Sequence, residues 1–240
     1  QKKLFIYIQG HTGNSYNDQY FLDIANKFKE EKYDILTLSM TGLNYNENNK
    51  INFPNYNKKL NPSLHKTYST YSDKNFPNKK PLSLMLSGNY YLIKKLIKQN
   101  NYEEIVMVGL SGGGWYTTLL SSIITEVNTS YSFAGTFPLF FRIFDTNIHD
   151  WEQIDSSLYE DVNYNSLYIL STLNEEYKVT RKHYQVFNDR DPCCFRNPSA
   201  TILKNMYENY DIKNFKISVV DNNEHSIDTK FLFNSFFSTQ

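Results

Sequence analysis

A short glycine-rich segment in the middle of the chain constrains the fold more than any other feature. Residues 105–108 (IVMV) are apolar and largely β-branched without alternation, which is typical of a parallel strand covered on both faces. Directly after them the chain reads Gly109-Leu110-Ser111-Gly112-Gly113, and from Gly112 onward apolar residues recur at helical spacing. The sequence therefore predicts a buried strand, a sharp turn with a serine at its tip, and a helix.

The glycines that flank this turn are those expected around a serine with strained backbone angles. Such a turn brings the chain close to its neighbours, so small residues are needed two positions before and two positions after the serine, where Gly109 and Gly113 stand. A phosphate-binding loop is the alternative, but the lysine of the P-loop is missing, and Ser111 stands where a dinucleotide-binding motif has its second glycine. The segment is therefore predicted to present Ser111 as a nucleophile.

The rest of the chain alternates between strand-like and helix-like segments. Apolar runs that predict strands lie at residues 4–8, 33–40, 131–137, 183–187 and 215–220. Apolar residues at helical spacing lie at 20–28, 82–98, 199–210 and 227–237. Residues 167–173 are apolar, but the run is too short for periodicity to separate strand from helix. This alternation predicts an α/β fold of three layers, with a mostly parallel sheet of about six strands and helices on both faces.

The length of the chain, 240 residues, suits one domain with a sizeable core, so we expect a single domain over residues 1–240. Two segments depart from the strand and helix pattern. Residues 41–81 are rich in Asn, Lys, Tyr and Pro and are expected to form an irregular excursion, either a mobile loop or a rim over a binding cleft. Residues 140–165 are mixed and aromatic and are expected to form a cap-like insertion with one or two short helices.

The charge balance argues against a polyanionic partner. The chain has 25 Lys plus Arg and 25 Asp plus Glu, so no net field favours nucleic acid or an anionic membrane. Its apolar runs fall short of the roughly 18 to 20 residues that span a bilayer. A small molecule is the expected partner. The oligomeric state and the compartment stay open, because a chain that opens at Gln1 without Met fits both a processed and a truncated N-terminus.

Cysteine and histidine are too sparse for a disulfide framework or a Cys/His metal centre. The two cysteines, Cys193 and Cys194, are adjacent and cannot join distant parts of the chain to each other. The five histidines are scattered along the sequence. We therefore expect no metal site and no cofactor, so that side chains must carry the chemistry. The cysteine pair is expected to pack as small buried residues or, alternatively, to form a strained vicinal disulfide.

A nucleophilic serine needs a histidine base at the same edge of the sheet. His225 fits this requirement best, since it lies in a polar turn after the last predicted strand and before the last predicted helix. Three other histidines, His65, His149 and His183, lie in the excursion, in the insertion and at the start of a strand. These three are expected to be surface or structural residues.

The third member of a catalytic triad is a carboxylate that orients the histidine. Asp189 and Asp191 both follow the strand predicted at 183–187. Asp191 is the preferred candidate and Asp189 the alternative, because the choice depends on turn geometry. Asp145, which follows an earlier strand, is a more distant alternative. A turn-forming role is the simpler explanation for any aspartate that does not contact the histidine.

The order Ser111, Asp191, His225 on an alternation of strands and helices resembles the α/β-hydrolase superfamily. The resemblance covers nearly the whole chain. It implies a sheet with the nucleophile beyond the carboxyl ends of its strands. It also implies that the chain begins at what corresponds to the third strand of the full family fold.

The resemblance further implies an oxyanion hole made by two main-chain N–H groups. One belongs to Gly112, directly after the nucleophile, and the other to His11 or Thr12 in the loop after the first strand. The His-Gly motif of that family loop reads Gln9-Gly10 here. Because the donors are main-chain groups, this departure leaves charge stabilisation in place.

The expected function is that of a serine hydrolase that cleaves a carboxylic ester or another acyl bond through an acyl-enzyme on Ser111. A peptidase or an acyltransferase would use the same triad, and a non-catalytic binding protein on the same fold is a further alternative. Trp115 and Trp151 are candidates to line an aromatic substrate cleft, although aromatic residues at such spacing more often belong to a core. The substrate itself is not identified by the sequence.

Overall fold

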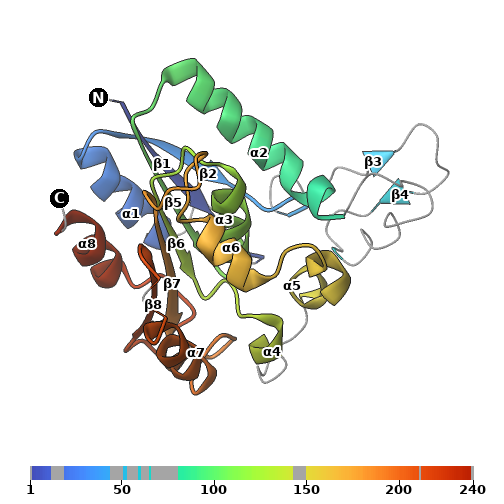
Figure 1. Ribbon diagram of the computed structural model, residues 1–240. Coiled ribbons are helices and arrows are strands. Elements are labelled where there is room, and N and C mark those ends of the chain that lie inside the picture. Colours follow the sequence, from blue (N-terminus) through green and yellow to red (C-terminus); the bar gives the residue numbers. More distant parts are fainter. Residues whose placement is uncertain are drawn as a thin grey trace.

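A six-stranded parallel sheet forms the centre of the molecule (Figure 1). The computed structural model describes residues 2–11, 19–43, 51–52, 59–60, 65, 81–142, 150–210 and 212–238. The strands of the sheet are β1 (Lys3–Ile8), β2 (Tyr33–Leu38), β5 (Glu104–Leu110), β6 (Thr129–Phe133), β7 (Lys182–Asn188) and β8 (Phe215–Val220). They lie in the order β2-β1-β5-β6-β7-β8, and all neighbours are parallel. The predicted α/β fold with about six mostly parallel strands is confirmed.

Helices cover both faces of this sheet. The α-helices of the described residues are α1 (Gln19–Glu30), α2 (Pro81–Asn100), α3 (Gly112–Ile123), α4 (Leu139–Arg142), α5 (Trp151–Ile154), α6 (Tyr164–Leu170), α7 (Ser199–Glu208) and α8 (Thr229–Phe237), of which α4 and α5 belong to the insertion. On one face, α1 and α8 pack together through Phe28 and Phe236, whose ring centroids lie 5.5 Å apart. On the other face, α3 contacts α2 and α6. Figure 1 shows these two groups on opposite sides of the sheet, which gives the predicted three layers.

In strand β6, side chains of different size point to the two faces of the sheet. Phe133 points toward α8, where its ring centroid lies 6.4 Å from that of Phe231. Its neighbour Ser132 points to the opposite face, because successive side chains of a strand alternate. There a Cβ atom added to Gly114 of α3 would lie only 3.1 Å from Ser132 Oγ. Large residues therefore pack against α8, and small residues admit α3 close to the sheet.

The two central strands bring the loop after β1 next to the turn after β5. Residues Leu4–Ile8 of β1 and Ile105–Leu110 of β5 are all buried, as expected for strands covered on both faces. The strands run in parallel register, with Ile8 opposite Gly109. The segments that follow β1 and β5 consequently leave the sheet side by side at its carboxyl edge, where ligands of such sheets bind.

Two local predictions need adjustment. The strand predicted at 131–137 is β6, which ends at Phe133, because the chain turns at Ala134 with a φ of 43°. The ambiguous run 167–173 belongs largely to the helix α6. The side chain of Asn163 begins that helix by accepting a hydrogen bond of 3.0 Å from the main-chain N–H of Ser166.

The two irregular segments are only partly described. Within 41–81 the described residues include a short antiparallel pair, β3 (Ile51–Asn52) with β4 (Lys59–Leu60); residues 44–50, 53–58, 61–64 and 66–80 lie outside the described part. Within 140–165, α4, α5 and the 3₁₀-helix η3 (Ser156–Tyr159) match the short helices expected there. Among the described helices, none combines the length and apolar character needed to cross a membrane.

Candidate active site

Ser111 lies on the turn between β5 and α3, at the carboxyl edge of the sheet. Its backbone angles are φ 57° and ψ −125°, a combination that residues with a side chain rarely adopt. The main-chain N–H of Ser111 donates a hydrogen bond of 2.8 Å to the carbonyl oxygen of Phe133 at the end of β6. The neighbouring strand thus holds the serine in the strained geometry that a nucleophile turn requires.

Glycines surround this turn because backbone from three elements meets there. A Cβ atom on Gly113 would lie 1.9 Å from the carbonyl oxygen of Ile8, and one on Gly109 would lie 2.1 Å from the carbonyl oxygen of Gly113. A Cβ atom on Gly10 would lie 2.9 Å from Cβ of Ser111. The need for small residues that the sequence suggests therefore has a direct steric cause.

The substitution Gly113→Ala is expected to lower the free energy of unfolding by at least about 3 kcal/mol, because the new methyl group meets main-chain atoms of β1 that cannot move without distorting the sheet. Gly88→Ala in α2 is the matched control, since its Cβ would meet no atom within 4 Å. That control is expected to gain up to about 1 kcal/mol. Urea unfolding of both variants measures the difference, and a Gly113→Ala protein as stable as the wild type would contradict the close approach.

His225 and Asp191 form a hydrogen-bonded pair beyond the ends of β8 and β7. His225 Nδ1 lies 2.8 Å from Asp191 Oδ2 and 3.0 Å from Oδ1. Asp191 is completely buried, and its Oδ1 also accepts hydrogen bonds from the main-chain N–H groups of Cys193 and Cys194, at 2.8 and 3.1 Å. Because the carboxylate only accepts, Nδ1 carries the proton, and the lone pair of the neutral ring lies on Nε2.

Of the two other candidate aspartates, only Asp189 lies in the described part of the chain, and it does not contact His225 there. Asp189 Oδ1 lies 3.5 Å from Nε of its neighbour Arg190, and no contact joins Asp189 to His225. Asp145 lies outside the described residues. Among the described candidates, Asp191 is therefore the aspartate that contacts His225.

The environment of His225 strengthens its basicity. Burial lowers the pKa of the imidazole, but the hydrogen bond to Asp191 and the charge of that carboxylate outweigh burial, so that the pKa lies above its usual value. Within the described residues, the structure records no hydrogen bond between Ser111 and His225. Such serine–histidine bonds are often long before substrate binds, and both residues reach the same edge of the sheet.

The two residues considered for an oxyanion hole, Gly112 and His11, lie close together. Gly112 is the first residue of α3, and N–H groups in a first helical turn have no acceptor within the helix. A Cβ atom on Gly112 would lie 2.6 Å from Nδ1 of His11, so the loop after β1 packs directly on this helix end. Thr12, the alternative donor, lies outside the described residues. The helix end and the loop therefore converge where negative charge would be stabilised.

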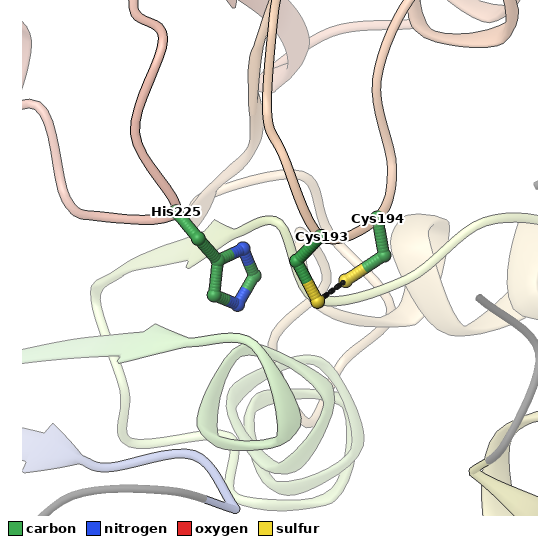
Figure 2. Close-up of side chains that lie close together, drawn as sticks. All are labelled: Cys193, Cys194 and His225. Atoms are coloured by element: carbon green, nitrogen blue, oxygen red, sulfur yellow. Dashed lines mark hydrogen bonds between the residues drawn. The ribbon is translucent and has the colours of Figure 1, made fainter. Parts of the chain in front are cut away.

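The adjacent thiols of Cys193 and Cys194 lie beside His225 (Figure 2). The two sulfur atoms are not joined in a disulfide, and the Sγ of Cys194 donates a hydrogen bond of 3.0 Å to the Sγ of Cys193. This contact and burial raise the pKa of the Cys194 thiol, so that thiol stays protonated. The pair packs behind Asp191, which corresponds to the simple packing role expected from the sequence.

The two tryptophans occupy different environments. Trp115 is completely buried, and its indole N–H donates a hydrogen bond of 2.9 Å to the hydroxyl of Tyr159. It therefore belongs to the core and presents no surface to a substrate, which corrects the cleft-lining interpretation for this residue. Trp151 begins α5, is partly exposed, and donates its N–H to Asp155 over 2.6 Å.

Two of the remaining histidines are buried, as expected for structural residues. His183 in β7 contacts Ser130 Oγ through Nδ1 at 2.7 Å and Gln185 Nε2 through Nε2 at 2.9 Å. Burial and the nearby charge of Arg181 lower the pKa of His183 to about 3, so its ring is neutral. His65 is also buried, whereas His149 lies outside the described residues.

A buried carboxylate that no motif marks in the sequence lies close to the turn. Glu152 Oε1 lies 2.8 Å from His11 Nε2 and 2.7 Å from His65 Nδ1. Burial raises the pKa of Glu152, but the hydrogen bonds from the two histidines outweigh it and lower that pKa to about 2. Among the residues that the structure describes, these three form one of two groups that could hold a metal ion, the other being Cys193, Cys194 and His225. Their sequence separations, 141 and 87 positions, hide the contact from sequence patterns.

Solved structures with a similar fold include esterases and a peptidase. Est1E from Butyrivibrio proteoclasticus, solved with ferulic acid, is 15% identical and aligns with a TM-score of 0.56 over 99% of this chain and 88% of that chain. An esterase of Pyrococcus furiosus, Pf2001, is 13% identical with a TM-score of 0.57, over 99% and 78%. The acylaminoacyl peptidase of Pyrococcus horikoshii is 16% identical with a TM-score of 0.60, over 99% and 37%. No protein-family model and no curated protein sequence matches the chain.

These similarities define the fold. The chain has the α/β-hydrolase fold, as its sequence resemblance implies. The neighbours named here are two esterases and one peptidase. Identities of 13–16% carry no information on the substrate of this chain.

Proposed function

We propose that this chain is a serine hydrolase that cleaves a carboxylic ester or another acyl bond through an acyl-enzyme on Ser111. The observation that carries the proposal is the strained turn of Ser111 at the same edge of the sheet as the Asp191–His225 pair. A strained serine is costly to maintain and is usually found where its exposure has a function. The esterases and peptidases among the structural neighbours support the same reaction class.

In the proposed mechanism, Ser111 Oγ attacks the acyl carbon while His225 Nε2 accepts the hydroxyl proton. Asp191 holds the Nδ1–H of His225 and stabilises the imidazolium that forms. The carbonyl oxygen becomes negative and accepts hydrogen bonds from the main-chain N–H groups of Gly112 and His11. The alcohol leaves with the proton of His225. Water then attacks the acyl-enzyme, gives a proton to the same nitrogen, and releases the acid and free Ser111.

The same residues would also serve a peptidase or an acyltransferase, which differ in the leaving group or in the acceptor of the acyl group. A panel of substrates separates them: p-nitrophenyl acetate and butyrate, an acetylated sugar, a peptide anilide, and a hydroxycinnamate ester, since one neighbour was solved with ferulic acid. We expect turnover of esters to exceed that of the anilide, with the free acid as product.

Transfer of the acyl group to an added alcohol in preference to water would instead favour an acyltransferase. No turnover of any acyl substrate, together with no acylation of the protein, would favour a non-catalytic binding protein and contradict the proposal.

The pH dependence of kcat/KM tests the role of His225. A general base must be neutral, so activity is expected to fall as the pH drops through its pKa. Because Asp191 raises that pKa, the half-maximal point is expected on the alkaline side of 6.5. Replacing Asp191 with Asn removes the charge and should move the half-maximal point of the residual activity to lower pH. A wild-type profile with its half-maximal point below pH 6.5 would contradict this role.

A further inference from the structure

Three side chains from three separate segments converge beside the nucleophile turn. His11 follows β1, His65 lies between β4 and α2, and Glu152 lies in α5. Both histidine nitrogens contact the same carboxylate oxygen, at 2.8 and 2.7 Å. All three potential ligand atoms lie within 4.8 Å of one another. The carboxylate is 1% exposed and the His65 ring 6% exposed, so neither is a solvated surface group.

We propose that His11 Nε2, His65 Nδ1 and Glu152 Oε1 bind a divalent transition-metal cation, for which zinc is the best fit. Two imidazoles and one carboxylate are a ligand set that zinc accepts, with bonds of about 2.0–2.2 Å. Ligand atoms around a tetrahedral zinc ion are then about 3.3 Å apart. The two contacts need to lengthen by about half an ångström to admit the ion. This site differs from the expectation of no metal, which rested on scattered histidines.

A hydrogen bond on the far side of the His65 ring orients Nδ1 toward Glu152. Its Nε2 lies 3.1 Å from the carbonyl oxygen of Thr41. Because a carbonyl oxygen can only accept, the Nε2–H group donates this hydrogen bond. In the neutral ring, Nδ1 then carries the lone pair and faces Glu152. Histidine ligands of metals commonly donate their other N–H to such a carbonyl group.

A fourth ligand position is available on the same side. Asp150 Oδ1 lies 3.7 Å from His11 Nε2, and its carboxylate is partly exposed, so either Asp150 or water can complete the coordination. A cation also matches the charge of the site, because the carboxylate of Glu152 is buried and its Oε1 faces both imidazole nitrogens.

The second candidate group fits a cation less well. The thiol of Cys194 is buried and donates a hydrogen bond to the Sγ of Cys193. Metals bind the deprotonated thiolate form instead. His225 already directs Nδ1 to Asp191. The group of His11, His65 and Glu152 is therefore the better site, and its cation would join three segments of the chain.

Isothermal titration of the chelator-treated protein with zinc chloride tests the site without reference to catalysis. We expect the wild type to bind about one equivalent. Glu152→Gln, which keeps the side-chain shape, is expected to weaken zinc binding by at least about tenfold. The double variant Cys193→Ser/Cys194→Ser is the matched control and should bind zinc within about twofold of the wild type. No zinc binding by the wild type, or equal binding by folded Glu152→Gln, overturns the proposal.

A spectrum of the cobalt-loaded wild type gives an answer even if Glu152→Gln does not fold. Cobalt(II) in a site of nitrogen and oxygen ligands is expected to show visible d–d bands without a thiolate-to-cobalt charge-transfer band. A charge-transfer band would place the ion on the cysteine pair and overturn the site. Because neither readout depends on ester turnover, failure here leaves the proposed hydrolase function untouched.

Discussion

Replacing Ser111 by alanine is expected to lower kcat/KM for an activated ester by on the order of 10⁴-fold or more, because the variant lacks the hydroxyl oxygen that would carry the acyl group. The substitution removes one oxygen atom and keeps Cβ. The hydrogen bond from the main-chain N–H to Phe133 also stays. The fold should therefore survive, with thermal unfolding close to that of the wild type.

Ser122→Ala is a suitable control for the serine experiment. Ser122 lies in α3 and donates its hydroxyl to the carbonyl oxygen of Leu119, away from the turn. Its replacement is expected to leave kcat/KM within about twofold, as for a side chain outside the machinery. Ester turnover by folded Ser111→Ala at more than a few per cent of the wild-type rate would contradict the assignment of Ser111.

Replacing Asp191 by asparagine is expected to lower kcat/KM by about 10² to 10⁴-fold. The carbonyl oxygen of the new amide can still accept from the N–H groups of Cys193 and Cys194, which directs the NH₂ group toward His225. His225 Nδ1 must then accept a hydrogen bond, so the ring takes the other tautomer and its Nε2 carries a proton. A ring in that state cannot receive the proton of Ser111.

Asp189→Asn provides the matched comparison, since it changes the same residue type two positions away. Asp189 pairs with Arg190 at a partly exposed position. A change within about threefold is expected for a surface pair of this kind. If instead Asp189→Asn abolished turnover and Asp191→Asn did not, the two aspartates would have been assigned in the wrong order.

The elements that the sequence predicts well are those set by local pattern. The run at 105–108 and the glycines around Ser111 specify strand, turn and helix through short-range sterics, and the structure has β5 and α3 there. The run at 167–173 is different, because a mostly apolar run of only seven residues satisfies either periodicity. Its helix depends on a cap at Asn163, which lies before the run.

Other features depend on contacts that local pattern does not encode. Asp191 contacts His225 because the backbone after it folds back and donates two N–H groups to its carboxylate. Trp115 is buried because residues of the insertion, including Tyr159, cover it. Glu152 meets His11 across 141 positions. Each contact is fixed by how distant segments meet.

Labelling with a fluorophosphonate probe, followed by mass spectrometry of the digested protein, tests the central proposal most directly. The probe reacts with serines activated by a neighbouring base. We expect one adduct per chain, located on Ser111, in the wild type and in Ser122→Ala. We expect none in Ser111→Ala, and greatly slowed labelling in Asp191→Asn. A wild-type protein that stays unlabelled, or that carries its adduct on another residue, would contradict a serine hydrolase built on Ser111.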